Sequence, residues 1–258
     1  MIYIESKDNN LFKNIKKIKE KRYRNRENKF LLEGFRIVEE AIKAKADIEC
    51  ILINKELEDK VENLETYKKN GKVVFLSKNL FDQLSDTENS QGIMAVVKNK
   101  ERDKNVEGSF FVVCDKVQDP GNLGTIIRTS HAAGVEGIIL TKGTADIYNE
   151  KTLRSTMGSI FYIPIYYDDE EFSIIKNLKA KGVTLVATSL EESRNFFEED
   201  LKGKIMLAVG NEGNGISEEL FNLSDKKVKI PMPGKAESLN VAVATSIILF
   251  EKVRQNLI

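Results

Sequence analysis

The segment 229–254 constrains the fold of this chain more than any other part of the sequence. Its first half is expected to be a loop, because Pro231, Pro233 and Gly234 interrupt regular helix and strand. After Ser238 nearly every residue is apolar, and a helix that is apolar on almost all sides is expected to be buried. Ser238 is also a favourable helix N-cap residue. A rigid loop therefore leads into a buried helix whose first N–H groups are unpaired, and we expect a binding surface at this junction.

The composition excludes several classes of protein. The chain has 258 residues, a length that favours two domains over one, and its 41% hydrophobic and 31% charged residues are typical of a globular protein. No apolar stretch of about 20 residues is present, so no segment is expected to span a membrane. Two cysteines, Cys50 and Cys114, and one histidine are too few for a disulfide framework or a zinc site, so no metal is expected. The N-terminus lacks the layout of a signal peptide, and a cytoplasmic location is expected.

Charge is distributed unevenly although the formal net charge is zero. Residues 13–29 contain nine Lys or Arg and only two Glu, with Tyr23 among them. Basic residues interleaved with an aromatic residue are typical of contact with RNA phosphates and bases, although a solvated helix end is the alternative. The candidates for RNA contact in this segment are Lys21, Arg22, Arg24 and Arg26.

Residues 1–98 alternate between strand-like and helix-like patterns, which predicts a small α/β domain. Helices are expected over 11–21, from Gly34 to 43, over 55–69 and over 77–84, and strands over 30–33, 48–53, 72–76 and 92–97. Residues 99–108 are charged and almost free of apolar side chains, so they are expected to be a linker.

Residues 109–258 predict a second α/β domain. An apolar strand over 109–117 is followed by a turn, a helix over 123–133 that ends at Gly134, and a strand over 137–140. This unit implies two parallel strands with a ligand-binding loop at their carboxyl ends. Further strands are expected over 163–167, 184–188, 204–209 and 228–230, and helices over 170–181, 191–200 and 216–223.

Three loops that follow strands stand out, and they cover Asp119–Arg128, Gly210–Gly215 and Ile230–Asn240. The middle loop, Gly-Asn-Glu-Gly-Asn-Gly, is either a nucleotide-binding loop or a simple tight turn. It is not a Walker A motif, because no Gly-Lys-Ser/Thr follows. A dinucleotide loop normally follows the first strand of its domain, whereas this loop lies near the end of the chain.

Taken together, the three loops resemble the three motifs of the SpoU (TrmH-type) RNA ribose 2′-O-methyltransferases of the SPOUT superfamily. The matching segments are Asp119-Pro-Gly-Asn-Leu-Gly-Thr-Ile-Ile-Arg128, Val209-Gly-Asn-Glu-Gly213 and Ile230-Pro-Met-Pro-Gly-Lys-Ala-Glu-Ser-Leu-Asn-Val241. The basic N-terminal domain is similar to the L30e-like substrate-binding domain of members that act on ribosomal RNA. The resemblance implies a parallel sheet flanked by helices with a C-terminal trefoil knot.

The resemblance also implies a cofactor and an assembly. Members of the family use S-adenosylmethionine without a metal, held by the second and third motifs, which correspond here to Gly210, Ile230 and Leu239, with Thr188 nearby. They are homodimers whose active site forms at the subunit interface in the C-terminal domain. The apolar helix after Leu239 is therefore a candidate for part of that interface.

The resemblance assigns catalytic roles to five residues. Arg128 matches the catalytic arginine, and because a guanidinium stays protonated we expect it to stabilise an oxyanion or clamp a phosphate rather than act as a base. Asn122 either caps its helix or orients the substrate or Arg128. Glu212 holds Arg128 or the attacking hydroxyl, or is a solvated carboxylate in a turn. Ser238 and Asn240 position the nucleophile, with N-capping as the alternative for Ser238.

Two further residues remain between a functional and a structural role. Arg154 is a candidate for contact with RNA phosphate, and an ordinary surface arginine is the alternative. His131, the only histidine, lies in the middle of the helix expected over 123–133, and we expect it to be structural.

The leading hypothesis is an S-adenosylmethionine-dependent methyltransferase that acts on the ribose of ribosomal RNA of the 23S type. The same chemistry on a tRNA loop is the nearest alternative, and the separate N-terminal domain favours ribosomal RNA. A different class of function is a non-catalytic RNA-binding or assembly factor on the same scaffold. A third possibility is a nucleotide-binding oxidoreductase that uses the loop 210–215.

Overall fold

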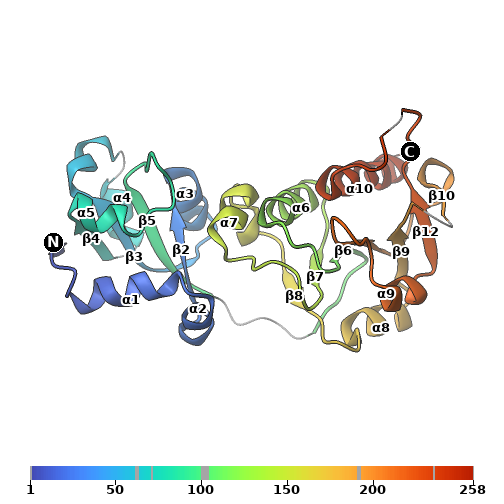
Figure 1. The fold of residues 1–258 in the computed structure, drawn as a ribbon, viewed down its shortest axis with the longest axis horizontal. Coiled ribbons are helices and arrows are strands. Elements are labelled where there is room, and N and C mark those ends of the chain that lie inside the picture. The colour runs from blue at the N-terminus through green and yellow to red at the C-terminus, as the bar shows by residue number, and fades with distance from the viewer. Residues whose placement is uncertain are drawn as a thin grey trace. The chain divides into compact units, whose positions relative to one another are not determined.

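The computed structural model describes residues 2–61, 64–70, 72–99, 105–190, 193–234 and 236–257, and the chain is drawn in Figure 1. The chain divides into two compact units, Met1–Glu101 and Arg102–Ile258. Residues 100–104, which belong to the segment expected to be a linker, lie outside the described residues. No helix in the described part of the chain is both long enough and apolar enough to cross a membrane.

The first unit is built on a five-stranded sheet in the order β1-β4-β3-β5-β2. The strands β1 and β3 pair with β4 in parallel, whereas β5 is antiparallel to both β3 and β2. The strands are β1 Ile2–Ile4, β2 Lys29–Glu33, β3 Asp47–Asn54, β4 Lys72–Leu76 and β5 Ile93–Lys98. The helices are α1 Asn10–Ile18, α2 Lys21–Glu27, α3 Phe35–Lys43, α4 Leu64–Asn70 and α5 Lys78–Asp82, with the 3-10 helix η1 Lys55–Lys60. The mixed α/β pattern predicted from the sequence is confirmed.

Two elements of this unit differ from the sequence prediction. The single helix expected over 55–69 is instead the short η1 followed by α4, and Glu62 and Asn63 between them lie outside the described residues. The basic segment after Glu20 forms its own helix, α2, which ends at Asn28 in the left-handed conformation with φ 53°. The strand β1 had no sequence prediction, because three residues are too few for a periodic pattern to be visible.

The second unit contains a seven-stranded sheet in the order β10-β12-β9-β11-β6-β7-β8, and all its strand pairs are parallel. The strands are β6 Phe110–Cys114, β7 Gly137–Leu140, β8 Ile165–Tyr167, β9 Thr184–Thr188, β10 Arg194–Asn195, β11 Ile205–Val209 and β12 Lys226–Lys229. The helices are α6 Pro120–Ala132, α7 Glu150–Thr156, α8 Ser173–Ala180, α9 Glu218–Leu223 and α10 Val241–Leu257, with the 3-10 helices η2 Ser159–Phe161 and η3 Phe196–Glu198.

Both faces of this sheet are covered, which explains why its strands are apolar at every position. Successive side chains of a strand point to opposite faces. In β6, Phe110 and Val112 pack in one buried cluster with residues of α6 and α10, whereas Phe111 and Val113 pack in another with residues of α8 and α9. Figure 1 shows α6 and α10 on one side of the sheet and α8 and α9 on the other. The predicted parallel pairing of the strands at 109–117 and 137–140 is confirmed.

The sequence prediction was wrong for two elements of this unit. The region 191–200, expected to be a helix, contains the short strand β10 and the 3-10 helix η3, with residues 191 and 192 outside the described residues. The helix α6 begins at Pro120 rather than at 123. Gly134 does end that helix, with φ 74°. The helix α7 was not predicted, and the trefoil knot stays a prediction from the resemblance.

The helix α10 is only half covered, which corrects the expectation that it is buried on all sides. Ala242 and Ile248 are buried against the sheet and α6, whereas Val243 and Phe250 are each 48% exposed. A helix that covers one face of a sheet can bury only the side that faces the sheet. The opposite side of α10 keeps an apolar stripe, because Val243, Phe250 and Leu257 recur at intervals of seven residues and all three are exposed.

Candidate active site

A closed loop follows the carboxyl end of β11. The backbone N–H of Asn211 donates to the carbonyl of Gly215 at 2.8 Å, and the N–H of Gly215 donates back to Asn211 at 2.9 Å. Gly210 precedes this loop, and a Cβ atom there would lie 2.1 Å from the carbonyl carbon of Gly215. Only glycine therefore permits the chain to turn back on itself at this point.

The same loop is anchored from both sides. The side-chain amide of Asn211 donates to the carbonyl of Lys116 at 3.0 Å. At the end of the loop, the backbone N–H of Ser217 donates to the buried carboxylate of Asp115 at 2.6 Å, and this carboxylate also accepts from the hydroxyl of Thr141 at 2.7 Å. Asp115 thus joins the carboxyl ends of β6 and β7 to the loop, a role that the sequence analysis missed.

The N-terminal end of α6 is capped by Asp119 and not by Asn122. The Asp119 carboxylate accepts from the backbone N–H of Asn122 at 2.8 Å, and Pro120 occupies the first turn. The sequence carried this signal, because aspartate directly before proline is a frequent helix start. Asp119 also forms an ion pair with Lys151 at 2.8 Å, and the hydrogen bond from Lys151 contributes most to lowering the pKa of Asp119.

Asn122 is therefore free to connect the three motif loops. Its amide nitrogen donates to Glu212 Oε1 at 2.9 Å, and its amide oxygen accepts from the amide nitrogen of Asn240 at 2.8 Å. Asn122 is separated by 90 residues from Glu212 and by 118 from Asn240 along the chain. The fold thus brings Glu212, Asn122 and Asn240 into one hydrogen-bonded chain, which we call the motif bridge.

Glu212 is held as a carboxylate. Partial burial raises its pKa, but the hydrogen bonds from Asn122 and from the backbone N–H groups of Gln118 and Asp119 outweigh that effect, so the pKa is lowered. Among the described residues, Glu212 and Arg128 share no hydrogen bond or ion pair. The expected contact between Glu212 and Arg128 is therefore absent from this part of the structure, and Glu212 instead fixes the start of α6.

Arg128 lies on α6 about 9 Å along the helix axis from Asn122, given 1.5 Å per residue. Its side chain is exposed and makes no hydrogen bond or ion pair with the residues that the structure describes. The structure therefore places Arg128 on the same helix as Asn122 but does not connect it to the motif bridge.

Asn240 has a second function, because its side-chain oxygen accepts from the backbone N–H of Ala242 at 2.9 Å and of Val243 at 3.3 Å. Asn240 thus caps α10, which begins at Val241, and the alternative interpretation of Ser238 as the N-cap is wrong. Ser238 lies two residues earlier and lines a cavity instead.

That cavity has a volume of ≈ 420 Å³ and lies at the carboxyl ends of β9, β11 and β12. The sequence candidates for cofactor and substrate contact that line it are Thr188, Gly210, Glu212, Ile230, Ser238, Leu239 and Asn240. Thr188 is oriented by a hydrogen bond from its hydroxyl to the carbonyl of Ala208 at 3.2 Å. Among the described residues, no group of His, Cys, Asp and Glu side chains could hold a metal ion.

Comparison with known proteins assigns the chain to a family. Residues 109–250 match the SpoU rRNA Methylase family, and residues 9–95 match the MRM3-like substrate binding domain. The chain belongs to the SpoU rRNA methylase family. Because the loop 210–215 lies within the region matched to this family, the interpretation as an oxidoreductase is abandoned.

Relatives of this SpoU chain match it over nearly its full length. The 23S rRNA (guanosine(2553)-2′-O)-methyltransferase RlmP of Bacillus subtilis is 40% identical over 97% of this chain and 98% of its own length. An S-adenosylmethionine-bound rRNA methyltransferase from Sinorhizobium meliloti has a similar structure, with a TM-score of 0.85, 34% identity and coverage of 99% and 98% of the two chains. The SpoU methyltransferase AviRb from Streptomyces viridochromogenes, solved in complex with the same cofactor, matches with a TM-score of 0.87 and 28% identity.

The four candidates for RNA contact on the basic helix α2 differ in exposure. Lys21, Arg22 and Arg26 are exposed. Arg24 is only 8% exposed, and its guanidinium donates to the carbonyls of Ile18 at 2.9 Å and Lys19 at 3.0 Å. Arg24 therefore satisfies the C-terminal carbonyls of α1, and the expectation that it contacts RNA is wrong.

Arg26 and Tyr23 form the aromatic part of this surface. The Arg26 guanidinium lies over the Tyr23 ring, 4.6 Å from its centroid, and forms an ion pair with Glu27 at 2.9 Å. The ammonium group of Lys17 lies 5.8 Å from the same ring. Tyr23 thus contacts two cations, Lys17 and Arg26, and each contact is weakly stabilising at an exposed site.

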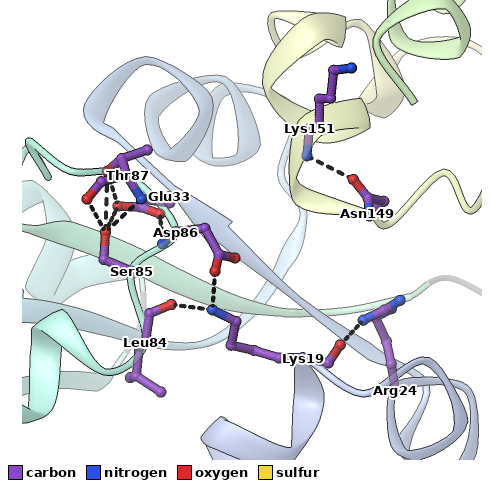
Figure 2. A network of polar contacts seen from close by, with 9 residues as sticks. All are labelled: Lys19, Arg24, Glu33, Leu84, Ser85, Asp86, Thr87, Asn149 and Lys151. Atoms are coloured by element: carbon purple, nitrogen blue, oxygen red, sulfur yellow. Dashed lines mark hydrogen bonds and ion pairs between the residues drawn. The ribbon is translucent and has the colours of Figure 1, made fainter. Parts of the chain in front are cut away.

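A second polar network fixes the loop after α5 in the same domain, as Figure 2 shows. Lys19 donates to the carbonyl of Leu84 at 2.9 Å and to Asp86 at 2.6 Å. Glu33 at the end of β2 accepts from the hydroxyls of Ser85 at 2.5 Å and Thr87 at 2.7 Å. The sequence analysis missed these residues, because they lie more than 50 positions apart and carry no motif.

Arg154 lies on α7 of the SpoU domain, where its side chain is exposed and makes no hydrogen bond or ion pair with the described residues. The helix α7 is capped by Asn149, whose side chain accepts from the backbone N–H of Lys151 at 2.9 Å (Figure 2). His131 is exposed on α6, and it packs against Tyr162.

Proposed function

We propose that this protein transfers a methyl group from S-adenosylmethionine to a ribose 2′-hydroxyl of ribosomal RNA of the 23S type, and that the acceptor nucleoside is a guanosine. The observation that carries this proposal is the motif bridge, because Glu212, Asn122 and Asn240 come from all three loops and meet beside the cavity. The guanosine is suggested by the name of the Bacillus subtilis relative. We also propose a cytoplasmic location, since the relative RlmP is a bacterial 23S rRNA methyltransferase.

The cavity fits the cofactor of the family. Its volume of ≈ 420 Å³ lies within the range of about 300–1,000 Å³ typical of small-molecule sites. Ile230, Met232 and Leu239 provide apolar contact area, whereas Thr188 and Asn211 provide polar groups. At Gly210 the backbone itself forms the wall. We propose that Gly210, Ile230 and Leu239 hold S-adenosylmethionine, with Thr188 at the edge of the site.

The bound cofactor supplies an activated methyl group on a sulfonium, so the protein needs to align the ribose hydroxyl and stabilise the charge that develops on its oxygen. We assign alignment to Ser238, Asn240 and Asn122. Glu212 keeps Asn122 in one orientation, since it accepts from the Asn122 amide nitrogen. We assign stabilisation of the oxyanion, or contact with the neighbouring phosphate, to Arg128, whose guanidinium stays protonated and is exposed.

We further propose that two copies of the chain associate through the C-terminal domain. The apolar stripe of α10, formed by Val243, Phe250 and Leu257, is exposed in the single chain. Leu239, which lines the cavity, is also 37% exposed, so the stripe continues toward the cofactor site. A second copy seated on this stripe would bury it and would bring an additional chain to the site that Arg128 approaches.

The basic surface of α2 is proposed to contact the RNA. Lys21, Arg22 and Arg26 are exposed and can neutralise phosphates without reading sequence. Arg154 on α7 offers a further exposed guanidinium in the SpoU domain. The alternative of a non-catalytic assembly factor on this scaffold predicts the same RNA contacts but no methyl transfer.

The decisive experiment is methyl transfer from tritiated S-adenosylmethionine to RNA from a deletion strain, offered as free RNA and as ribosomal subunits, with nuclease mapping of the label. The proposal expects label in one guanosine ribose of 23S-type RNA, and labelling about 10²–10³-fold slower with the Arg128→Ala variant. Label in tRNA would instead identify a tRNA as the substrate. RNA binding without label in any preparation would favour the assembly factor.

A further inference from the structure

An exposed pair of stacked rings lies on the SpoU domain outside the cavity. The rings of His131 and Tyr162 are nearly parallel, with 4° between their planes and 5.2 Å between their centroids. A hydrogen bond between His131 Nδ1 and the hydroxyl oxygen of Ser159, 3.2 Å apart, fixes the imidazole ring. Tyr162 is 45% exposed although His131 covers one face of its ring. The pair is therefore a rigid aromatic surface that faces solvent.

The position of the pair follows from close packing of α6 on the chain segment that contains α7 and η2. A Cβ atom at Gly124 would lie 2.5 Å from the carbonyl oxygen of Thr152, so the two elements touch through backbone at this point. Seven residues further along α6, His131 meets Ser159 in η2. The two segments thus run side by side in the same direction, and the ring pair stands at the far end of their contact.

The pair also shares a face of α6 with Arg128. Residues three positions apart are neighbours on a helix surface, and Arg128 precedes His131 by three. Their Cα atoms are separated by about 4.5 Å along the helix axis, and Asn122 lies about 13 Å from His131 along the same axis. At 3.6 residues per turn, however, Asn122 and His131 project from opposite sides of α6, so it is the exposed guanidinium of Arg128, and not the motif bridge, that lies beside the stacked rings.

We propose that His131 and Tyr162 form a stacking platform for an unpaired base of the RNA substrate. A flat exposed ring that already stacks in parallel can be continued by another flat ring, and nucleobases are the planar groups that an RNA offers. The adjacent Arg128 suits the phosphate that accompanies such a base. This inference rests on the proposed function for its choice of RNA as the ligand, but it concerns binding and not methyl transfer.

The sequence contains no tryptophan, so Tyr162→Trp introduces a single indole at the platform. Its fluorescence is titrated with 23S ribosomal RNA and with large ribosomal subunits, both from the deletion strain. Stacking of a base on the indole is expected to quench the emission by at least half. The matched control is Tyr167→Trp, because Tyr167 is 47% exposed and lies on β8 of the same domain but outside the ring pair. Its emission is expected to change little.

Affinity is measured in parallel by filter binding. Tyr162→Ala is expected to weaken RNA binding about tenfold, as for the loss of one stacked base, whereas Tyr162→Phe keeps the ring and should bind as the native protein does. Binding of S-adenosylmethionine should remain unchanged in both variants. His131→Ala should weaken RNA binding less than Tyr162→Ala does. It removes only the imidazole that stacks on Tyr162 and leaves the Tyr162 ring for the base.

Three outcomes would overturn the platform. Unchanged emission of the Tyr162→Trp variant on saturation with both RNA preparations is the first. Equal RNA affinity of the Tyr162→Ala and native proteins is the second. An emission change on dilution of the protein, with none on addition of RNA, would instead assign the rings to contact between copies. Methyl transfer by the native protein is scored separately, so a failed platform with normal methylation leaves the proposed function intact.

Discussion

The N-terminal end of α6 and the helix α2 hold their polar side chains in opposite ways. At α6, Asn122 uses both ends of its amide to join Glu212 and Asn240, so its orientation is fixed from two sides. On α2, Lys21 and Arg22 extend into solvent and make no side-chain hydrogen bond or ion pair with the described residues.

The difference reflects what each surface has to do under the proposed function. In-line displacement requires reacting atoms to be aligned within a fraction of an ångström, which demands side chains that cannot turn. Phosphate contact depends on charge far more than on geometry, so mobile cations are sufficient. Arg128 is the exception at the catalytic end, since it is exposed and unconnected to the motif bridge. The variants below test this contrast.

The largest expected effect is that of Arg128→Ala. Loss of the guanidinium should lower kcat by about 10²–10³-fold, the usual cost of removing one oxyanion-stabilising donor. The thermal midpoint and S-adenosylmethionine affinity should stay unchanged, because the side chain is exposed and makes no hydrogen bond or ion pair with the described residues. Single-turnover methyl transfer and calorimetry test the two parts. A lower thermal midpoint of the Arg128→Ala variant would show that Arg128 is a structural residue.

Gly210→Ala tests how rigid the loop after β11 is. The added Cβ would meet the backbone of Gly215 at 2.1 Å, so the loop must open. We expect at least tenfold weaker binding of S-adenosylmethionine, measured by calorimetric titration, and a lower thermal midpoint. Gly213→Ala is the control within the same loop, because the nearest atom to its Cβ is 3.7 Å away. Equal effects of the two substitutions would contradict the close approach at Gly210.

The pH dependence of stability tests Glu212. Its pKa in the folded protein is lowered from the ordinary value of 4.5, because hydrogen bonds to the carboxylate outweigh partial burial. A lowered pKa stabilises the fold above pH 4.5, and this contribution is lost as the pH falls below that value. Glu212→Gln should flatten the stability profile in this acid range. Denaturant unfolding at a series of pH values measures the stability of both proteins. Identical profiles for the Glu212→Gln variant and the native protein would show that the hydrogen bonds to Glu212 do not favour its ionised form.

The smallest effects are expected from the pair Arg24→Ala and Arg22→Ala on α2. Arg24→Ala should lower the free energy of unfolding by about 1–3 kcal/mol, because the carbonyls at the end of α1 lose a charged donor. Arg22→Ala should leave stability unchanged and reduce the slope of log affinity against log salt by about one, as for one lost phosphate contact. Denaturant unfolding and salt-dependent RNA binding distinguish them. If both variants had the same stability and the same salt dependence of RNA binding, Arg24 and Arg22 would not have the different roles assigned to them.

The sequence by itself determined the architecture and the parts of the site. Alternating strand and helix patterns predicted both α/β units, and the continuous apolar runs predicted buried parallel strands such as β6 and β11. The three motif loops predicted the family, and they supplied every residue of the motif bridge. These features are local, because strand and helix periods and loop motifs are written in consecutive residues.

Only the tertiary structure decided which role each of these residues has. Asn122 and Ser238 are both suitable helix caps, yet Asp119 and Asn240 cap instead. The sequence could not decide this, since several neighbouring residues satisfy the same local rule.

Arg24 was indistinguishable from Arg22 until the packing of α2 on α1 buried one of them. The exposed stripe of α10 and the stacked pair His131–Tyr162 likewise depend on which face packs against the rest of the domain. Long-range contacts fix these choices, and their partners lie up to 118 residues away along the chain.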